Sequence, residues 1–195
     1  MTYLDKAPRF CADSTQGQVK LTDYIGKWLI LLSYDKDFTP VCTTELMAIA
    51  KLYKNICDMN ADVLAFCKDS VPTHIAWAND ISKNCGVSIQ FPIVSDEDNS
   101  ICNMYGVQDK SCVYIINPEQ CIVATLSYPK CVGRNIPEIL RIISALQSST
   151  ENSTQTPANW LPGCDMFSNS RNSYIDFMDK FRDNSTWFFD TKRLI

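Results

Sequence analysis

The sequence predicts an α/β protein, folded as a three-layer sandwich around a mixed β-sheet. Short apolar runs that are typical of buried strands alternate with amphipathic helical stretches, and a hairpin and one more helix follow them. The 195 residues are 46% hydrophobic and 21% charged, a composition that can bury a sizeable core. Alternating strands and helices favour parallel strands, and the hairpin adds antiparallel ones, so the sheet is expected to be mixed.

The first half of the chain supplies the parallel part of this sheet. Residues 28–34, WLILLSY, are predominantly apolar and predict a strand that is buried on both sides. The stretches 63–67 and 91–96 predict two more buried strands. Between them, apolar residues over 43–59 recur at helical spacing, and a second helix over 72–84 opens with a proline, which a first helical turn accepts.

The second half of the chain completes the sheet with a hairpin. Residues 112–126, CVYIINPEQCIVATL, alternate in the manner of two strands that turn at residues 117–120. A short helix that Gly106 can close comes before the hairpin. A helix that Asn135 can cap comes after it and runs to about Gln147.

The domain organisation follows from where the periodic pattern ends. Residues 1–147 are predicted to form one domain. The polar stretch 148–156, SSTENSTQT, has no hydrophobic period and is predicted to be a linker. Residues 157–195 are too few for a core of their own, but their aromatic side chains can dock on a partner. These aromatic residues are Trp160, Phe167, Tyr174, Phe177, Phe181, Trp187, Phe188 and Phe189.

Charge and hydropathy exclude several classes of function. The formal net charge of -4 gives no basic surface for nucleic acid or for an acidic membrane. The longest apolar run, residues 28–32, is far too short to span a bilayer. The N-terminal sequence MTYLDKAPRF is charged where a signal peptide would be apolar. A cytoplasmic location is therefore expected, with no nucleic-acid or membrane partner.

The ten cysteines do not form a recognisable metal or disulfide pattern. No two of them stand in a C-x-x-C pair, so zinc ribbons and thioredoxin-type dithiols lack their spacing. The single histidine, His74, cannot supply the histidine pairs of most zinc sites. No metal and no cofactor are expected, and most of the thiols are predicted to be small buried side chains.

One cysteine, Cys42, stands where its thiol can be reactive. It lies in the run DFTPVCTTEL, just after a buried strand and at the start of a helix. A thiol attacks only as the thiolate, and the free N–H groups and dipole of a helix N-terminus favour that anion. Thr39 can offer its hydroxyl to the sulfur or to a substrate oxygen. From position alone, an inert buried cysteine is an equally good interpretation.

The run DFTPVCTTEL resembles the active-site loop of the peroxiredoxins, specifically of their one-cysteine type. The resemblance continues through SVPTHIAWANDI, FPIVSD, YPKCVGRNIPEILRIISALQ and TPANWLPG, and covers most of residues 1–147. It implies a thioredoxin-like fold and the reduction of hydrogen peroxide, organic hydroperoxides or peroxynitrite. Cys42 would become a sulfenic acid, which an external thiol such as a thioredoxin-like protein or glutathione would reduce. The resemblance also implies a homodimer, across which the C-terminal extension reaches.

The resemblance assigns roles to individual residues. Cys42 matches the cysteine that attacks the peroxide, and Thr39 matches the threonine that hydrogen-bonds it. Glu45 matches a glutamate that pairs with an arginine near the pocket, and that arginine is Arg134 in VGRN. Two further residues of the loop, Pro40 and Val41, are expected to contact the peroxide.

Two more positions carry the residues of the one-cysteine type. These are His74 and Trp77. We interpret His74 as a packed or capping histidine, because the expected mechanism needs no further acid or base.

The chain departs from the family pattern at two positions of the site. Asp35 stands where the family has a proline that shields the cysteine from water. Its carboxylate would oppose thiolate formation, and the adjacent Lys36 can compensate. Ser111 stands where the family has an arginine that stabilises thiolate and peroxide. Lys110 beside it supplies a cation but not the planar fork of a guanidinium.

The chain also lacks the family's second, resolving cysteine. Thr156 occupies that position, directly before the Pro-x-x-Trp run. Cys131 and Cys164 are possible substitutes, although neither matches a family position. A one-cysteine mechanism is therefore expected. The alternative is a catalytically weak or inactive relative that acts as a redox sensor or a chaperone-like oligomer.

Overall fold

The computed structural model describes residues 6–107, 109–168 and 191–192, and the chain divides into two compact units, Met1–Ile136 and Pro137–Ile195. The first unit is built on a seven-stranded sheet with the order β2-β1-β5-β4-β3-β6-β7. Its strands are β1 Cys11–Ser14, β2 Gly17–Lys20, β3 Trp28–Ser33, β4 Ala61–Cys67, β5 Ile93–Ser95, β6 Lys110–Ile116 and β7 Ile122–Pro129. The sheet is mixed, as predicted, because β3, β4 and β5 run parallel whereas β6 and β7 are antiparallel to their neighbours.

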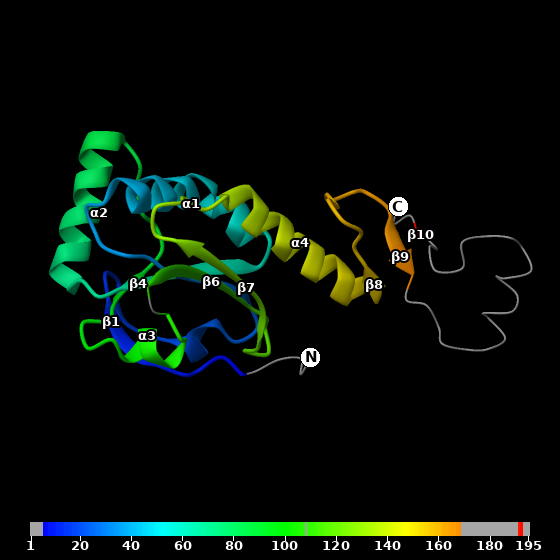
Figure 1. Cartoon of the computed structure of the whole chain (residues 1–195), viewed down its shortest axis with the longest axis horizontal. Helices are drawn as coiled ribbons and strands as arrows, with labels where there is room; N and C mark the ends of the chain where they lie inside the picture. The colour runs from blue at the N-terminus through cyan, green and yellow to red at the C-terminus, as the bar shows by residue number, and fades with distance from the viewer. Residues whose placement is uncertain (1–5, 108, 169–190, 193–195) are drawn as a thin grey trace, which may run out of the picture. The chain divides into compact units, whose positions relative to one another are not determined.

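Helices cover both faces of this sheet. The helices α1 and α2 lie over one face, and α3 lies with a short 3₁₀ helix over the other (Figure 1). Their bounds are α1 Pro40–Asp58, α2 Val71–Cys85, α3 Ser100–Met104 and the 3₁₀ helix Leu21–Tyr24. The predicted three-layer arrangement is confirmed.

The core follows from the two-residue period of the central strands. All six residues of β3 are buried, and alternate residues of the strand point to opposite faces. Leu29 and Leu31 belong to the cluster under α3, together with Ile101 and Tyr105. The continuous apolar run of the sequence therefore marks a strand with a helical layer on each side.

The helix that carries the candidate cysteine begins earlier than predicted. Its first residue is Pro40, with Thr39 as the N-cap, whereas the periodicity indicated a start at Thr43. Proline at this position costs no hydrogen bond, since the first N–H groups of a helix have no partner within it. Cys42 therefore lies inside the first turn of α1.

Most other predicted elements are confirmed with small shifts of their ends. The strand predicted at 91–96 is shorter, Ile93–Ser95, and the predicted helix at 72–84 gains one residue at each end. Ser70 caps that helix, because its hydroxyl accepts the Thr73 N–H. The strands β1 and β2, at one end of the sheet, had no counterpart in the prediction. Their short, mostly exposed sequences carry little hydrophobic period.

The second unit contains α4 and a small three-stranded sheet. The helix α4 spans Ile136–Asn152, and the strands are β8 Thr154–Gln155, β9 Met166–Ser168 and β10 Thr191–Lys192. Ala145, Trp160 and Met166 form a separate buried cluster. None of the helices in the described ranges has the length and apolar character that a membrane crossing requires.

The stretch 148–156, predicted to be a linker, is largely regular structure. It contains the end of α4 and the strand β8. Its polar side chains lie mostly on the surface, so the polar composition reflected exposure rather than an irregular backbone. The division into a domain at 1–147 and an extension at 157–195 stays a prediction. Trp160 and Phe167 are described; the six tail aromatics from Tyr174 to Phe189 lie outside the described residues.

Candidate active site

Cys42 lies buried in the first turn of α1, with 4% of its surface exposed. Pro40 has no N–H group, and no side chain caps this end of the helix. The Thr39 hydroxyl instead donates to the carbonyl oxygen of Lys36 at 2.9 Å, so its oxygen lone pairs remain available to a donor. The free backbone N–H groups of this turn and the helix dipole favour an anion at the Cys42 sulfur.

Glu45, one turn further along α1, binds the loop that carries Arg134. Its carboxylate accepts the Arg134 backbone N–H at 2.9 Å and lies 3.5 Å from the guanidinium Nε. The guanidinium Nη2 donates to the carbonyl oxygen of Ser33, at the end of β3. The predicted pairing of Glu45 with Arg134 is therefore present, and it joins residues 89 positions apart.

The Arg134 guanidinium is fully buried and electrostatically coupled to Cys42. Burial lowers the pKa of Arg134, whereas the charges of Glu45 and of the Cys42 thiolate raise it. The guanidinium nevertheless stays positively charged, because arginine does not lose its proton in proteins. Its Nη1 has no hydrogen-bond partner in the described part of the chain, although buried donors are nearly always paired. This donor is therefore available to a thiolate or to a substrate oxygen.

The loop before Arg134 also closes on the residue before Cys42. A Cβ atom on Gly133 would lie 3.8 Å from Cγ1 of Val41, an ordinary van der Waals distance, so the loop lies beside Val41. Val41 is half-buried and Pro40 is exposed. Their assignment as peroxide contacts stays a prediction.

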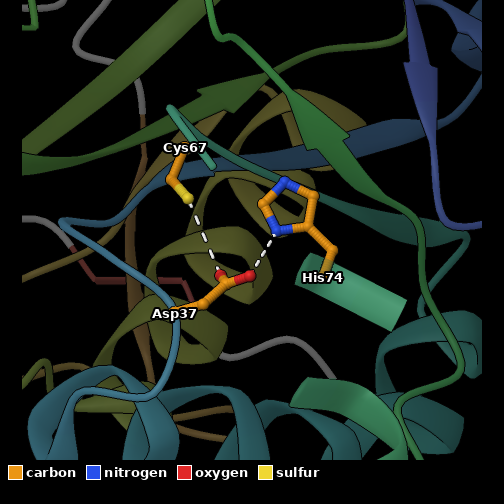
Figure 2. Close-up of side chains that lie close together, drawn as sticks. All are labelled: Asp37, Cys67 and His74. Atoms are coloured by element: carbon orange, nitrogen blue, oxygen red, sulfur yellow. Dashed lines mark hydrogen bonds and ion pairs between the residues drawn. The ribbon is translucent and has the colours of Figure 1, made fainter. Parts of the chain in front are cut away.

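A buried polar cluster anchors the other end of the active-site loop (Figure 2). The Asp37 carboxylate lies 2.7 Å from His74 Nδ1 and accepts the Tyr34 hydroxyl at 2.7 Å. The Cys67 thiol lies 3.7 Å from the same carboxylate. All four residues are buried. His74 is thus a packed histidine, as interpreted from the sequence, and Asp37 is an anchor that sequence reasoning missed, although it opens the run DFTPVC.

Aspartate, cysteine and histidine are also zinc-ligand types, and the three donor atoms lie within 4.8 Å of one another. Two ligand atoms of a tetrahedral zinc ion are about 3.3 Å apart, from bond lengths near 2.0 Å. The 2.7 Å contact between Asp37 and His74 is instead a hydrogen-bond distance. Burial also raises the pKa of the Cys67 thiol. We therefore interpret the cluster as a hydrogen-bonded anchor.

The anchor holds a sharp turn of the backbone. Phe38 has a φ of 57°, a left-handed conformation that is costly for a bulky residue. Phe38 is 54% exposed, and the centroid of its ring lies 6.3 Å from that of the buried Trp77. Asp37 on one side of this residue is fixed by the cluster, and Thr39 on the other begins the helix, so the fold maintains the strained turn.

Removing the imidazole is expected to destabilise the domain. His74→Phe leaves the buried Asp37 carboxylate without one of its charge-assisted partners, so the free energy of unfolding should fall by about 2 to 4 kcal/mol. Urea unfolding followed by circular dichroism measures this change. Lys83→Met, an exposed substitution on the same helix, is the control and should stay within about 0.5 kcal/mol of wild type. An equally small change for His74→Phe would contradict the anchoring role.

Asp35, which replaces the family's proline, is paired with Lys130. The Lys130 Nζ lies 2.6 Å from the Asp35 carboxylate, and this hydrogen bond raises the pKa of Lys130. The expected compensation by Lys36 is wrong, because Lys36 is exposed and has no ion pair within the described ranges. The ion pair joins the loop after β3 to the loop that leads to Arg134.

Ser111, which replaces the family's arginine, is buried in β6 opposite Tyr128 of β7. The adjacent Lys110 is exposed. The guanidinium that reaches the Cys42 turn is therefore that of Arg134.

The two candidate resolving cysteines, Cys131 and Cys164, are both exposed free thiols, the second of them in the C-terminal unit.

The central strand β3 leads into α1, and α1 carries a buried cysteine in its first turn. This arrangement is that of a thiol-based redox protein of thioredoxin-like fold. The sequence model of the AhpC/TSA family matches residues 4–125, and the chain belongs to this family, that of the peroxiredoxins. Membership implies thiol-dependent peroxidase activity.

Relatives and solved structures agree with this assignment. Peroxiredoxin 2 of Picrophilus torridus is 36% identical over 198 residues, which cover 97% of this chain and 98% of the relative. A mitochondrial 1-Cys peroxiredoxin of yeast superposes with a TM-score of 0.83 at 33% identity, covering 93% of this chain and 92% of the other. Peroxiredoxin 6 of Arenicola marina gives the same TM-score at 32% identity, covering 90% and 86%.

Proposed function

We propose that the protein reduces hydrogen peroxide and organic hydroperoxides, with Cys42 as the nucleophile. The observation that carries this proposal is the placement of the buried Cys42 in the first turn of α1, beside the unpaired Nη1 donor of Arg134. A helix N-terminus and a buried guanidinium together favour the thiolate and a developing negative charge on a peroxide oxygen.

The oxidation step breaks the O–O bond of the peroxide. The Cys42 thiolate attacks one oxygen, which becomes the hydroxyl of a sulfenic acid, and the other oxygen leaves as an alkoxide or hydroxide that takes up a proton. Sulfur is oxidised by two electrons and the peroxide is reduced by two. The Thr39 oxygen accepts a hydrogen bond from the peroxide, and Glu45 holds Arg134 in position. Pro40 and Val41 line the approach.

An external thiol then restores Cys42. It attacks the sulfenic sulfur and releases water, and a second thiol cleaves the resulting mixed disulfide. This one-cysteine mechanism is supported by Thr156 at the position of the resolving cysteine. The reductant is a thioredoxin-like protein or glutathione, the two systems named for the yeast 1-Cys peroxiredoxin. The chemistry uses no cofactor and no metal.

A stoichiometric peroxide pulse tests the oxidation step. Within seconds, the intact protein should gain the mass of one oxygen atom, and a sulfenic-acid reagent should label Cys42. The matched control is Cys42→Ser, which keeps the other nine thiols and should gain no label. Labelling spread equally over the exposed cysteines would count against Cys42 as the nucleophile.

A weak or inactive relative is the second candidate, one that senses oxidants or acts as a chaperone-like oligomer. The observation that favours it is Ser111 at the position of the family's arginine, which leaves Arg134 as the one guanidinium at the Cys42 turn among the described residues. Rapid sulfenic acid formation at Cys42 would argue against this candidate. Slow oxidation, at the rate of an ordinary exposed thiol, would support it.

We also propose that the chain forms a homodimer and acts in the cytoplasm. The aromatic side chains of the C-terminal extension support the dimer. Sedimentation equilibrium of the full chain tests it, and a monomeric mass across the micromolar range would exclude it.

A further inference from the structure

An exposed segment, residues 130–133, leads from the end of β7 to the buried Arg134. Within it, the Val132 N–H donates to the carbonyl oxygen of Pro129 at 3.0 Å and closes a turn. That hydrogen bond is internal to the loop and does not attach it to the rest of the domain. Exposed segments with few buried contacts open more easily than the core. The position of Arg134 therefore depends on where this loop is tied to its neighbours.

Two polar contacts tie the loop to the end of β3. The Arg134 Nη2 donates to the carbonyl oxygen of Ser33, and the Lys130 Nζ lies 2.6 Å from the Asp35 carboxylate. Ser33 and Asp35 are two residues apart, and Lys130 and Arg134 are four residues apart. A single contact would leave the two segments free to rotate about it, whereas two contacts fix their relative orientation. The ion pair thus joins the same two segments as the guanidinium.

The ion pair is strong enough to matter and exposed enough to be opened. The side chains of Lys130 and Asp35 are 43% and 33% exposed. Their hydrogen bond raises the pKa of Lys130, the charge of Asp109 adds to this, and Lys130 therefore stays cationic at neutral pH. Partly exposed ion pairs contribute modestly and are screened by salt. An effect of severalfold that depends on salt is the expected scale.

We propose that the Asp35–Lys130 ion pair positions Arg134 beside Cys42, so that both partners are positioning residues for the peroxidase reaction. The inference rests on the proposed function. Neither side chain acts on the peroxide. They keep the loop of Arg134 against the end of β3, and β3 leads into the helix of Cys42. When the pair opens, segment 130–133 moves and the guanidinium spends less time at the sulfur.

Single substitutions separate positioning from a direct effect of charge. If Asp35 acted on Cys42 only through its charge, Asp35→Asn would favour the thiolate and speed oxidation, whereas Lys130→Met would slow it. Positioning instead predicts that both variants oxidise Cys42 about fivefold more slowly, and that the double variant is no slower than either. Rapid mixing with hydrogen peroxide measures this rate constant.

Three controls make the result specific. The reversed pair, Asp35→Lys with Lys130→Asp, should recover most of the wild-type rate. Lys27→Met breaks the ion pair of Lys27 with Asp62 at the other end of β3 and should keep that rate. Hydrogen peroxide is uncharged, so raising NaCl from about 0.02 M to about 0.5 M should slow the wild type toward the single variants and leave those nearly unchanged. Faster oxidation of Asp35→Asn, or a reversed pair as slow as the single variants, would overturn the proposal.

Hydrogen exchange reads the loop without chemistry. The Arg134 N–H is bound to the Glu45 carboxylate at 2.9 Å, and its exchange reports opening of the loop. It should be about fivefold faster in Asp35→Asn and in Lys130→Met, and unchanged in Lys27→Met. Unchanged exchange in all three variants would overturn the proposal. A wild-type protein that does not oxidise Cys42 would refute the proposed function, whereas hydrogen exchange would still decide whether the ion pair holds the loop.

Discussion

Replacing Cys42 by serine is expected to abolish peroxide turnover, with a loss of at least about a thousandfold in the rate constant for hydrogen peroxide. Serine keeps the size and the helix position but cannot form a thiolate at neutral pH or store the transferred oxygen as a sulfenic acid. Peroxide consumption in the presence of a thiol reductant measures the loss, with the background rate of the thiol subtracted.

Matched cysteine variants make this result specific. Cys131→Ser and Cys164→Ser each remove an exposed thiol and should keep the wild-type rate of Cys42 oxidation. They also decide how Cys42 is restored: a one-cysteine mechanism predicts full turnover in both variants with an external thiol. Turnover by Cys42→Ser at the wild-type rate would remove the basis of the proposed function. Loss of turnover in Cys131→Ser or Cys164→Ser alone would contradict the one-cysteine mechanism.

Replacing Arg134 by methionine is expected to slow the reaction of Cys42 with hydrogen peroxide about 100-fold to 1,000-fold. The variant keeps an unbranched, flexible side chain, although a shorter one, and removes the buried positive charge and the unpaired Nη1 donor. Stopped-flow kinetics with hydrogen peroxide at neutral pH measures this rate constant.

Two further variants separate charge from geometry at this position. Arg134→Lys restores a positive charge without the planar fork, and should recover part of the rate. Glu45→Gln keeps an acceptor for the Arg134 N–H but removes the carboxylate charge. We expect a smaller loss, because the loop stays attached. Folding is checked for each by circular dichroism. A folded Arg134→Met variant with the wild-type rate would show that Nη1 does not act on the peroxide.

The sequence located the helices and central strands because their signals are local. The apolar run at 28–34 identified β3, and the Pro-x-Cys-Thr-Thr run placed a cysteine at a helix start. The resemblance to the peroxiredoxins then separated Cys42 from the nine other cysteines. The strands β1 and β2 and the true end of α4 were missed, since exposed or polar segments form regular structure through pairing and packing rather than through a periodic pattern.

Partners within the site could be assigned only in part. Glu45 and Arg134 were paired through the resemblance, but the attachment of the guanidinium to the end of β3 was not predictable. Lys36 was expected to compensate for the charge of Asp35 because it is adjacent, but sequence adjacency says little about which cation a side chain meets. In the folded chain that cation is Lys130, 95 residues away in sequence and 2.6 Å away in space.

The sequence by itself determined the fold class and the placement of Cys42 in the first turn of a helix, because an N-terminal helical turn is set by a few neighbouring residues. Tertiary structure alone decided the electrostatic surroundings of that turn. It brought a buried guanidinium to Cys42, neutralised Asp35 through Lys130, and fixed the loop through Asp37 and His74. These are contacts between segments far apart in the chain, and their strength depends on burial, which only the packed fold provides.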